Sequence, residues 1–279
     1  MKIFTTRTAL SEYLSVEREQ GKSIGFVPTM GALHEGHLSL IRTAAEKSDL
    51  VVVSIFVNPT QFNDLNDLKK YPRPIESDLE KLKSVKCDVL FMPEVSEMYS
   101  GDEIWEPQLD GLDTILEGKQ RTGHYKGVTQ IVKKLLDVVN PNLVFFGQKD
   151  YQQFLIISKM VSNSGMNMEI VMCPTVREKD GLAMSSRNIH LSDEEHQVAL
   201  TLSRVLKQAK TDFTTLSIPE VKAKAIKTLT STPGLTLEYF DICDGSSLQP
   251  VITKDSDSII ALMAARVGTT RLIDNIIIR

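Results

Sequence analysis

The stretch Ile24-Gly25-Phe26-Val27-Pro28-Thr29-Met30-Gly31-Ala32-Leu33-His34-Glu35-Gly36-His37 decides the fold of this chain. It opens with a short apolar run that is typical of a buried strand, and the residues from His37 to Lys47 show the apolar spacing of an amphipathic helix. A strand that turns through glycines into a helix presents the unpaired N–H groups of the first helical turn, which favour an anion. His34 and His37 lie about one helical turn apart at this junction, so both imidazoles can face the same anion. The stretch therefore predicts a site for polyanion chemistry.

The first part of the chain repeats this strand–helix alternation. Its apolar runs are continuous, as expected of parallel strands buried on both faces: Ile24–Val27, Leu50–Val57, Val89–Met92, Leu143–Gly147 and Glu169–Cys173. Amphipathic stretches lie between or after them: His37–Lys47, Pro74–Ser84, Val128–Val139 and Tyr151–Ser164. This order predicts an α/β protein with a Rossmann-like, doubly wound parallel sheet. The G-x-G-x-x-G fingerprint of dinucleotide-binding proteins does not occur in the sequence.

Ligands of open parallel sheets bind outside the carboxyl ends of the strands. Three segments follow predicted strands and are expected on this edge: Pro28–His37, Asn58–Phe62 and Gly147–Asp150. The long stretch Tyr99–Lys126 has little periodicity, so it is either a functional lid or contains structure that the pattern does not reveal.

A change of pattern at Pro174–Leu182 predicts a domain boundary. Beyond it, two helical patterns (Asp193–Lys210 and Pro219–Ser231) precede three strand-like runs (Leu235–Cys243, Ser258–Ala264 and Thr270–Ile277). We therefore expect a catalytic domain over residues 1–175 and a smaller C-terminal α+β lid domain over residues 176–279, with the boundary segment as a candidate hinge.

Composition narrows the class of protein. The chain has 279 residues, 42% of them hydrophobic and 24% charged, which is ordinary for a globular protein. A net charge of −4 predicts no broad basic surface and no nucleic-acid partner. Three widely spaced cysteines resemble small buried apolar residues rather than a disulfide or metal framework. The N-terminus lacks the apolar core of a signal peptide and no apolar run is long enough to span a membrane, so a cytoplasmic location is expected.

Three further segments carry candidate site residues, each with a simpler alternative. Asn58 and Gln61 offer uncharged amides for a small hydroxy acid, or form an ordinary strand-end turn. In Gly147-Gln148-Lys149-Asp150, Lys149 provides a mobile positive charge for phosphate, while Asp150 either caps the next helix or accepts from ribose hydroxyls. Gln153 follows Lys149 by one helical turn. Residues 121–127 (RTGHYKG) form either an anion-binding loop or a solvated surface loop.

Met184-Ser185-Ser186-Arg187 resembles the lysine–serine (KMSKS) loop with which class I adenylate-forming enzymes bind the triphosphate of ATP. Two hydroxyls and a guanidinium can hold phosphate oxygens at several points. His-x-Gly-His at residues 34–37 likewise resembles the signature of the nucleotidyl-transfer superfamily, whose members attack the α-phosphate of ATP and release pyrophosphate.

Six motifs in order resemble one family, pantothenate synthetase (pantoate–β-alanine ligase), along nearly the whole chain. They are residues 28–37, 56–62, 71–73, 121–124, 146–153 and 184–188. The resemblance implies a ligase that joins pantoate to β-alanine through a pantoyl adenylate, releasing AMP and pyrophosphate. Gln148 stands where many relatives carry an acidic residue, at a position that the family uses mainly through its backbone.

The resemblance also implies roles for individual residues. His37, His34, Lys149 and Arg187 would be catalytic, with His37 the proton donor to phosphate. Gln61 and Gln153 would bind pantoate, and Gln61 would also reach β-alanine. The ATP site would comprise Met30, Gly31, Ala32, Leu33, His34, Glu35, Gly36, His37, Gly147, Gln148, Lys149, Asp150, Val176, Met184, Ser185, Ser186 and Arg187.

Mg²⁺ is expected to accompany ATP, held by phosphate oxygens and water without a dedicated set of protein ligands. The family is typically a homodimer, so a homodimer is expected here. Two other functions remain open from the residues: a nucleotidylyltransferase that keeps the adenylate as its product, and a non-catalytic nucleotide-binding module. Release of AMP would distinguish the ligase from the first, and a module without chemistry would not need both histidines together with Lys149 and Arg187.

Overall fold

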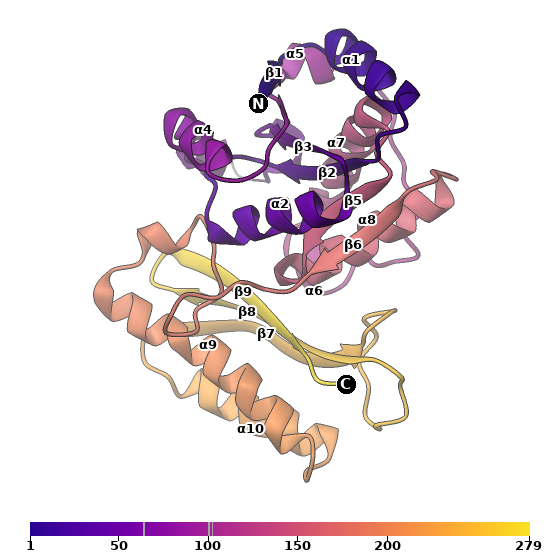
Figure 1. Ribbon diagram of the computed structural model, residues 1–279. Helices are drawn as coiled ribbons and strands as arrows, with labels where there is room; N and C mark the ends of the chain where they lie inside the picture. Colours follow the sequence, from indigo (N-terminus) through magenta and orange to yellow (C-terminus); the bar gives the residue numbers. More distant parts are fainter. Residues whose placement is uncertain (64, 100, 102) are drawn as a thin grey trace. The chain divides into compact units, whose positions relative to one another are not determined.

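The computed structural model describes residues 1–63, 65–99, 101 and 103–279 (Figure 1). The chain folds into two compact units. The first unit is Met1–Gly147 with Gln153–Pro174, and the second is Gln148–Gln152 with Thr175–Arg279. The short segment Gln148–Gln152, which our predicted boundary assigns to the first domain, thus belongs with the C-terminal part of the chain.

The first unit contains a six-stranded sheet in the order β1-β4-β3-β2-β5-β6, and every adjacent pair is parallel. Its strands are β1 (Lys2–Phe4), β2 (Ile24–Thr29), β3 (Leu50–Ile55), β4 (Val89–Phe91), β5 (Leu143–Gly147) and β6 (Glu169–Cys173). Its helices are α1 (Arg7–Glu19), α2 (Glu35–Lys47), α3 (Leu65–Lys70), α4 (Ile75–Lys83), α5 (Val95–Met98), α6 (Leu116–Gln120) and α7 (His124–Val139), with a short 3₁₀ helix η1 (Pro59–Gln61). Helix α8 (Tyr151–Asn163) also belongs to this unit from Gln153 onward.

Burial explains why the predicted strands form this sheet. All six residues of β3 are buried, and β2 is buried except at Pro28. Helix α2 contacts β2, β3, β5 and β6, and α7 contacts β2 and α1. Figure 1 shows α2 in front of this sheet and α7 behind it, so the central strands are covered on both faces. The order of the strands along the chain changes direction between β2 and β5, which is where a doubly wound sheet binds ligands.

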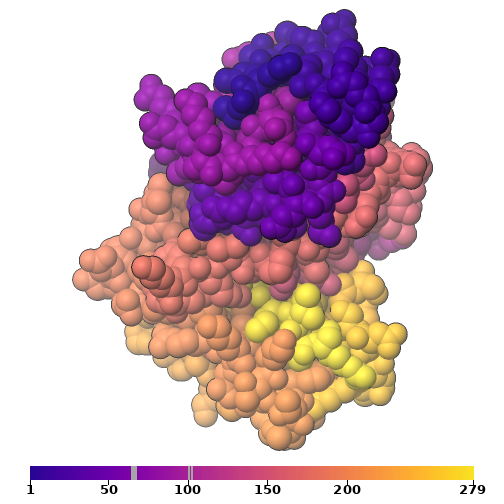
Figure 2. All heavy atoms as spheres, viewed as in Figure 1, coloured from indigo at the N-terminus to yellow at the C-terminus, as the bar shows by residue number. Residues whose placement is uncertain are grey.

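The second unit has a three-stranded antiparallel sheet, β7-β8-β9, packed on two helices. Its elements are the 3₁₀ helices η2 (Gln148–Asp150) and η3 (Asn188–His190), helices α9 (Asp193–Asp212) and α10 (Ile218–Thr230), and strands β7 (Leu235–Asp244), β8 (Ile259–Val267) and β9 (Thr270–Ile277). Yellow atoms of the C-terminal strands reach the surface beside the orange atoms of the helices (Figure 2). The predicted fold class, a Rossmann-like parallel sheet with a smaller C-terminal α+β part, is confirmed.

The sequence analysis did not predict β1, α1, η1, α3 or α5, and the stretch Tyr99–Lys126, for which it left a lid or hidden structure open, is partly helical. Strand β1 has only three residues, none of them buried, so it has no readable period. Helix α1 buries Leu10 and Leu14 at a spacing of four residues, a signal that was present in the sequence but overlooked. The stretch Tyr99–Lys126 contains α6 and the start of α7, while Ser100 and Asp102 within it lie outside the described residues.

Among the described residues, no helix combines the length and apolar character needed to cross a membrane.

The three cysteines are free and buried, as predicted from their apolar surroundings. Burial raises the pKa of Cys87 and of Cys243 to about 12, and it also raises the pKa of Cys173. Thiolate is therefore scarce at pH 8, and we expect none of the three thiols to react with a disulfide reagent in the folded protein. All three should react after unfolding in guanidinium. Rapid labelling of a thiol in the folded protein would contradict this expectation.

Candidate active site

The turn between β2 and α2 has a backbone conformation that its sequence explains. Gly31 and Ala32 both have positive φ, +79° and +50°, the left-handed region that glycine enters without cost and alanine does not. The hydroxyl of Thr29 accepts from the Gly31 N–H at 3.2 Å and donates to the Ser54 carbonyl at 2.7 Å. The turn is thereby tied to the neighbouring strand β3.

A buried carboxylate holds the same turn from another element. Asp78, in the first turns of α4, is fully buried, and its two oxygens accept the backbone N–H groups of Ala32 at 2.8 Å and Leu33 at 2.7 Å. Lys81 on the same helix donates to the Leu33 carbonyl at 2.6 Å. Hydrogen bonds to an ionised acceptor are among the stronger ones in proteins, and this pair restrains an otherwise unfavourable φ at Ala32. Asp78 therefore fixes the residues immediately before His34.

Replacing Asp78 with alanine should lower the free energy of unfolding by about 2–5 kcal/mol, because two buried N–H groups lose their acceptor. Asp78→Asn retains one acceptor oxygen but turns an amide NH2 toward the other backbone N–H, so it should also be destabilising. Urea unfolding followed by circular dichroism measures both. Asp137→Ala, which breaks an exposed ion pair with Lys133 on α7, is the matched control and should change stability by less than about 1 kcal/mol. Equal stability of Asp78→Ala and the wild type would contradict this anchoring role.

His34 and His37 lie together at the start of α2. His34 is the N-cap residue, with extended backbone (φ −135°, ψ 176°), and the two rings are 4.1 Å apart between centroids. The His34 backbone N–H donates to Nδ1 of His37 at 3.3 Å, so a neutral His37 ring carries its proton on Nε2. The predicted juxtaposition of the two imidazoles at a helix N-terminus is present. This arrangement can place N–H donors around a phosphate group.

Gln61 is buried in η1 and belongs to a polar network. Its Oε1 accepts from Asn58 Nδ2 at 3.1 Å, while its Nε2 donates to the Met30 sulfur at 3.0 Å. The Asn58 amide also accepts from the Tyr99 hydroxyl at 2.7 Å, and burial raises the pKa of that phenol, which keeps it a neutral donor. Because a thioether is a weak acceptor, the Gln61 amide can exchange the Met30 contact for an oxygen of a small acid.

The segment Arg121–Gly127 supports this network. Arg121 contacts His124 Nε2 at 2.9 Å, and His124 Nδ1 lies 2.8 Å from the Gln61 carbonyl oxygen. A Cβ on Gly127 would lie 2.5 Å from the Thr60 carbonyl oxygen, so only glycine permits this approach of α7 to η1. The structure thus gives the segment a contact with the Gln61 turn, and its predicted binding of an anion remains a prediction.

In the second unit, Lys149 lies in η2 with its side chain 21% exposed. Its Nζ is 3.8 Å from Asp150 Oδ1, a weak and partly exposed ion pair. Two backbone carbonyls of η2, those of Gln148 and Lys149, each accept from the Asn275 side chain at 2.9 Å. Lys149 therefore projects from a turn whose backbone is fixed to β9.

The Met184–Arg187 loop is also held at its base. A β-bridge pairs Arg177 with Ala183, and the Met184 N–H donates to the Val176 carbonyl at 3.0 Å. The Ser185 hydroxyl accepts from the Arg187 N–H at 3.3 Å. Met184, Ser185, Ser186 and Arg187 are all partly exposed, so their side chains are accessible on a loop with a fixed start.

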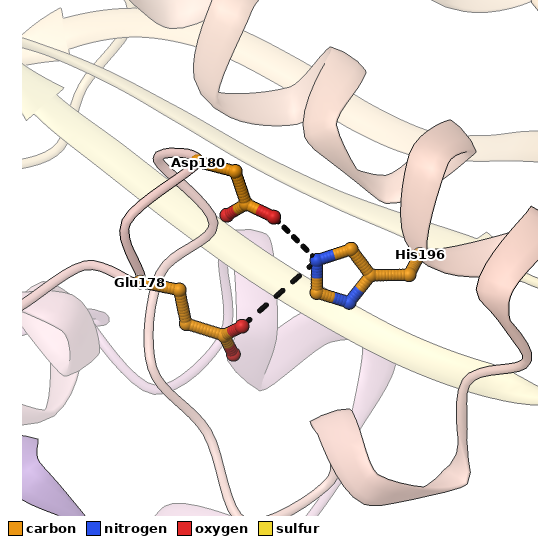
Figure 3. Close-up of side chains that lie close together, drawn as sticks. All are labelled: Glu178, Asp180 and His196. Atoms are coloured by element: carbon orange, nitrogen blue, oxygen red, sulfur yellow. Dashed lines mark hydrogen bonds and ion pairs between the residues drawn. The ribbon is translucent and has the colours of Figure 1, made fainter.

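A cluster of Glu178, Asp180 and His196 links the turn that precedes the Met184–Arg187 loop to α9 (Figure 3). Nε2 of His196 lies 2.7 Å from Asp180 Oδ2 and 3.9 Å from Glu178 Oε2. The hydrogen bond with His196 lowers the pKa of Asp180. This cluster is the one group of three potential metal ligands found in the described part of the chain, and the short Asp180–His196 hydrogen bond accounts for the proximity of its side chains.

The predicted site residues thus form separate groups within the two units. The first unit contains Met30, Gly31, Ala32, Leu33, His34, Glu35, Gly36, His37, Gln61, Gly147 and Gln153, and the second contains Gln148, Lys149, Asp150, Val176, Met184, Ser185, Ser186 and Arg187. Within the first unit, a Met30–Gln61 contact joins the His-x-Gly-His turn to the Gln61 turn. The supporting residues Asp78 and Asn275 are among those that the sequence analysis missed. An Asp in the first turn of a predicted helix and an Asn inside a strand were the available signals.

Fold and site together define a Rossmann-like α/β protein with paired histidines at the strand–helix turn beside its topological switch point. The family model described as pantoate-beta-alanine ligase matches residues 2–277. This chain belongs to the pantoate–β-alanine ligase family.

Individual relatives agree with this assignment. The chain is 46% identical to a protein named pantothenate synthetase from Phocaeicola vulgatus, over 99% of each chain. A pantothenate synthetase structure from Thermus thermophilus matches with a TM-score of 0.93 and 37% identity, covering 100% of this chain and 99% of that one. A pantoate-beta-alanine ligase from Francisella tularensis, complexed with beta-gamma ATP and beta-alanine, matches with a TM-score of 0.82 and 38% identity over 100% and 98% of the chains.

Proposed function

We propose that this chain joins (R)-pantoate to β-alanine at the expense of ATP, forming pantothenate through a pantoyl adenylate. In the first step a pantoate carboxylate oxygen bonds to the α-phosphorus of ATP, and the bond to the leaving pyrophosphate breaks. In the second, the β-alanine amine attacks the acyl carbon, the acyl–oxygen bond to AMP breaks, and the amine loses a proton. The His34–His37 pair at the N-terminus of α2 carries this proposal, since it suits a polyphosphate, and family membership supports it.

The first step brings a carboxylate toward a polyanion, so its transition state needs donors and cations. We assign phosphate contacts to His34 and His37, with Nε2 of His37 as the proton donor. Lys149 and Arg187 would balance the charge that builds on the phosphates, with the Ser185 and Ser186 hydroxyls as further donors. The remaining predicted ATP-binding residues would line the adenosine and triphosphate, including Met30, Gly147 and Val176.

Gln61 is assigned to pantoate and β-alanine, and Gln153 to pantoate. Gln61 is supported by its burial and by the weak sulfur acceptor that its amide now contacts. An uncharged pocket floor suits hydroxyl and carboxylate groups and favours a small hydroxy acid over a phosphorylated substrate. This chemistry favours the ligase over a nucleotidylyltransferase.

Mg²⁺ is proposed as the companion of ATP. The side chains at the His-x-Gly-His turn are imidazoles, whereas Mg²⁺ prefers oxygen ligands. Asp78 is already engaged by two backbone N–H groups, and Glu35 pairs with Arg42. These residues fit an ion held mainly by ATP oxygens and water, which would supply charge neutralisation. A homodimer in the cytoplasm completes the proposal.

The first test is pyrophosphate–ATP isotope exchange with Mg²⁺ and pantoate, without β-alanine. Exchange that depends on pantoate would support the adenylate step, and AMP release on adding β-alanine would support the second. If neither exchange nor AMP formation occurs with all three substrates and folded protein, the proposal fails. Pantoate-dependent exchange without AMP release on adding β-alanine would favour the nucleotidylyltransferase.

A further inference from the structure

Two adjacent polar residues of β9, Asp274 and Asn275, are almost completely buried in the second unit, with 3% and 2% of their surfaces exposed. Neighbouring side chains of a strand point to opposite faces, so the two can serve different segments. Buried polar groups are costly unless they are hydrogen-bonded. The hydrogen-bond partners of Asp274 and Asn275 therefore indicate the structural role of these two residues.

Asn275 is bonded to η2 through every polar atom of its side chain. Nδ2 donates to the carbonyls of Gln148 and Lys149, both at 2.9 Å, and Oδ1 accepts from Gln148 Nε2 at 3.2 Å. A primary amide has two donor hydrogens and a carbonyl acceptor, and this site uses both kinds. These bonds span 126 and 127 residues of sequence. They give a physical reason why Gln148–Gln152 belongs with the C-terminal part of the chain.

Asp274 is bonded to the start of the other segment. Both of its oxygens accept from the Arg177 guanidinium, at 2.7 and 2.9 Å, in a bidentate pair. Arg177 also donates to the Gly181 carbonyl at 3.2 Å and pairs with Ala183 by a β-bridge. The guanidinium thus fixes the base of the loop that continues into Met184–Arg187.

We infer that Asp274 and Asn275 are positioning residues, which hold the Lys149 turn and the Arg187 loop on one rigid strand. The two cations would then keep a defined separation without either β9 residue touching substrate. This inference rests on the proposed function only for the roles of Lys149 and Arg187. Because a displacement of about 1 Å can cost about 10²-fold in rate, a rigid common support for both cations matters to the chemistry.

The test compares near-isosteric variants. Asn275→Asp replaces the two-hydrogen donor with an oxygen that faces two carbonyls, and Asp274→Asn weakens the Arg177 pair. Asn275→Ala is a second variant if Asn275→Asp fails to fold. Asp241→Asn is the control, because it breaks an ion pair between β7 and Lys222 of α10 and touches neither segment.

Hydrogen–deuterium exchange is the readout that does not depend on activity. We expect at least about tenfold faster exchange in residues 148–152 for the Asn275 variants and in residues 177–188 for Asp274→Asn, with β7 unchanged. The rate of pantoate-dependent pyrophosphate exchange should fall about 10–100-fold with little change in KM for pantoate, whereas Asp241→Asn should stay within about twofold of the wild type.

Unchanged deuterium uptake in both segments would overturn the inference, as would an equal rise across β7, which would assign these contacts to overall stability. A wild-type protein without pantoate-dependent activity would count against the proposed function alone, because the deuterium measurements still report on the two segments.

Discussion

Replacing His37 with alanine should lower the rate of pantoate-dependent pyrophosphate–ATP exchange by about 10²–10³-fold, the usual cost of losing one oriented donor to a transition state. His37 is held for this role, because its Nδ1 accepts from the His34 N–H and its proton is left on Nε2. The His34 peptide is in turn fixed by the Asp78 contacts just before it. We expect the loss mainly in kcat, since the donor acts on charge that develops during the reaction.

Glu46→Ala is the matched control for His37→Ala. It lies on the same helix α2 with an exposed side chain, so it tests whether an alanine substitution in this helix alters activity by itself. Its exchange rate should be close to that of the wild type. Full activity of His37→Ala beside a folded circular dichroism spectrum would remove the central residue from the proposed mechanism.

Replacing Lys149 with alanine should reduce the same rate at least as much as His37→Ala, because it removes a full positive charge proposed to face the triphosphate. The side chain is partly shielded from water, which strengthens its interaction with an anion. The Asn275 bonds to the Gln148 and Lys149 carbonyls hold the backbone in place, so the substitution should affect charge rather than the turn itself.

Lys149→Arg should also be impaired, because a planar guanidinium cannot occupy the place of a compact ammonium in a turn that is fixed on β9. Single-turnover formation of the adenylate measures both variants. Lys159→Ala, which removes a lysine of α8 paired with Asp110, is the control and should leave the rate unchanged. An active Lys149→Ala, or a Lys149→Arg equal to the wild type, would contradict the assigned role.

Local patterns of apolar and polar residues in the sequence predicted most of the fold. The bounds of β5, β6 and β9 agree with the predicted segments. Strands β5 and β6 are mainly apolar runs, whereas β9 combines apolar residues with Arg271, Asp274 and Asn275. The helices α2, α4 and α8 differ from their predicted ranges by one or two residues at their ends, where the periodic signal is weakest. Strand β1 shows the limit of this approach, since three residues, none of them buried, have no period to read.

By itself, the sequence determined the alternation of strands and helices, the His-x-Gly-His turn and the candidate residues that follow the strands, since these depend on neighbours in the chain. Only the tertiary structure determined which distant residues hold these segments in place. Asp78 reaches Leu33 across 45 residues, Arg177 reaches Asp274 across 97, and Asn275 reaches Gln148 across 127. Such polar pairs have no period and no spacing rule, because they form only after the hydrophobic core has brought distant segments together and buried groups that must then be hydrogen-bonded.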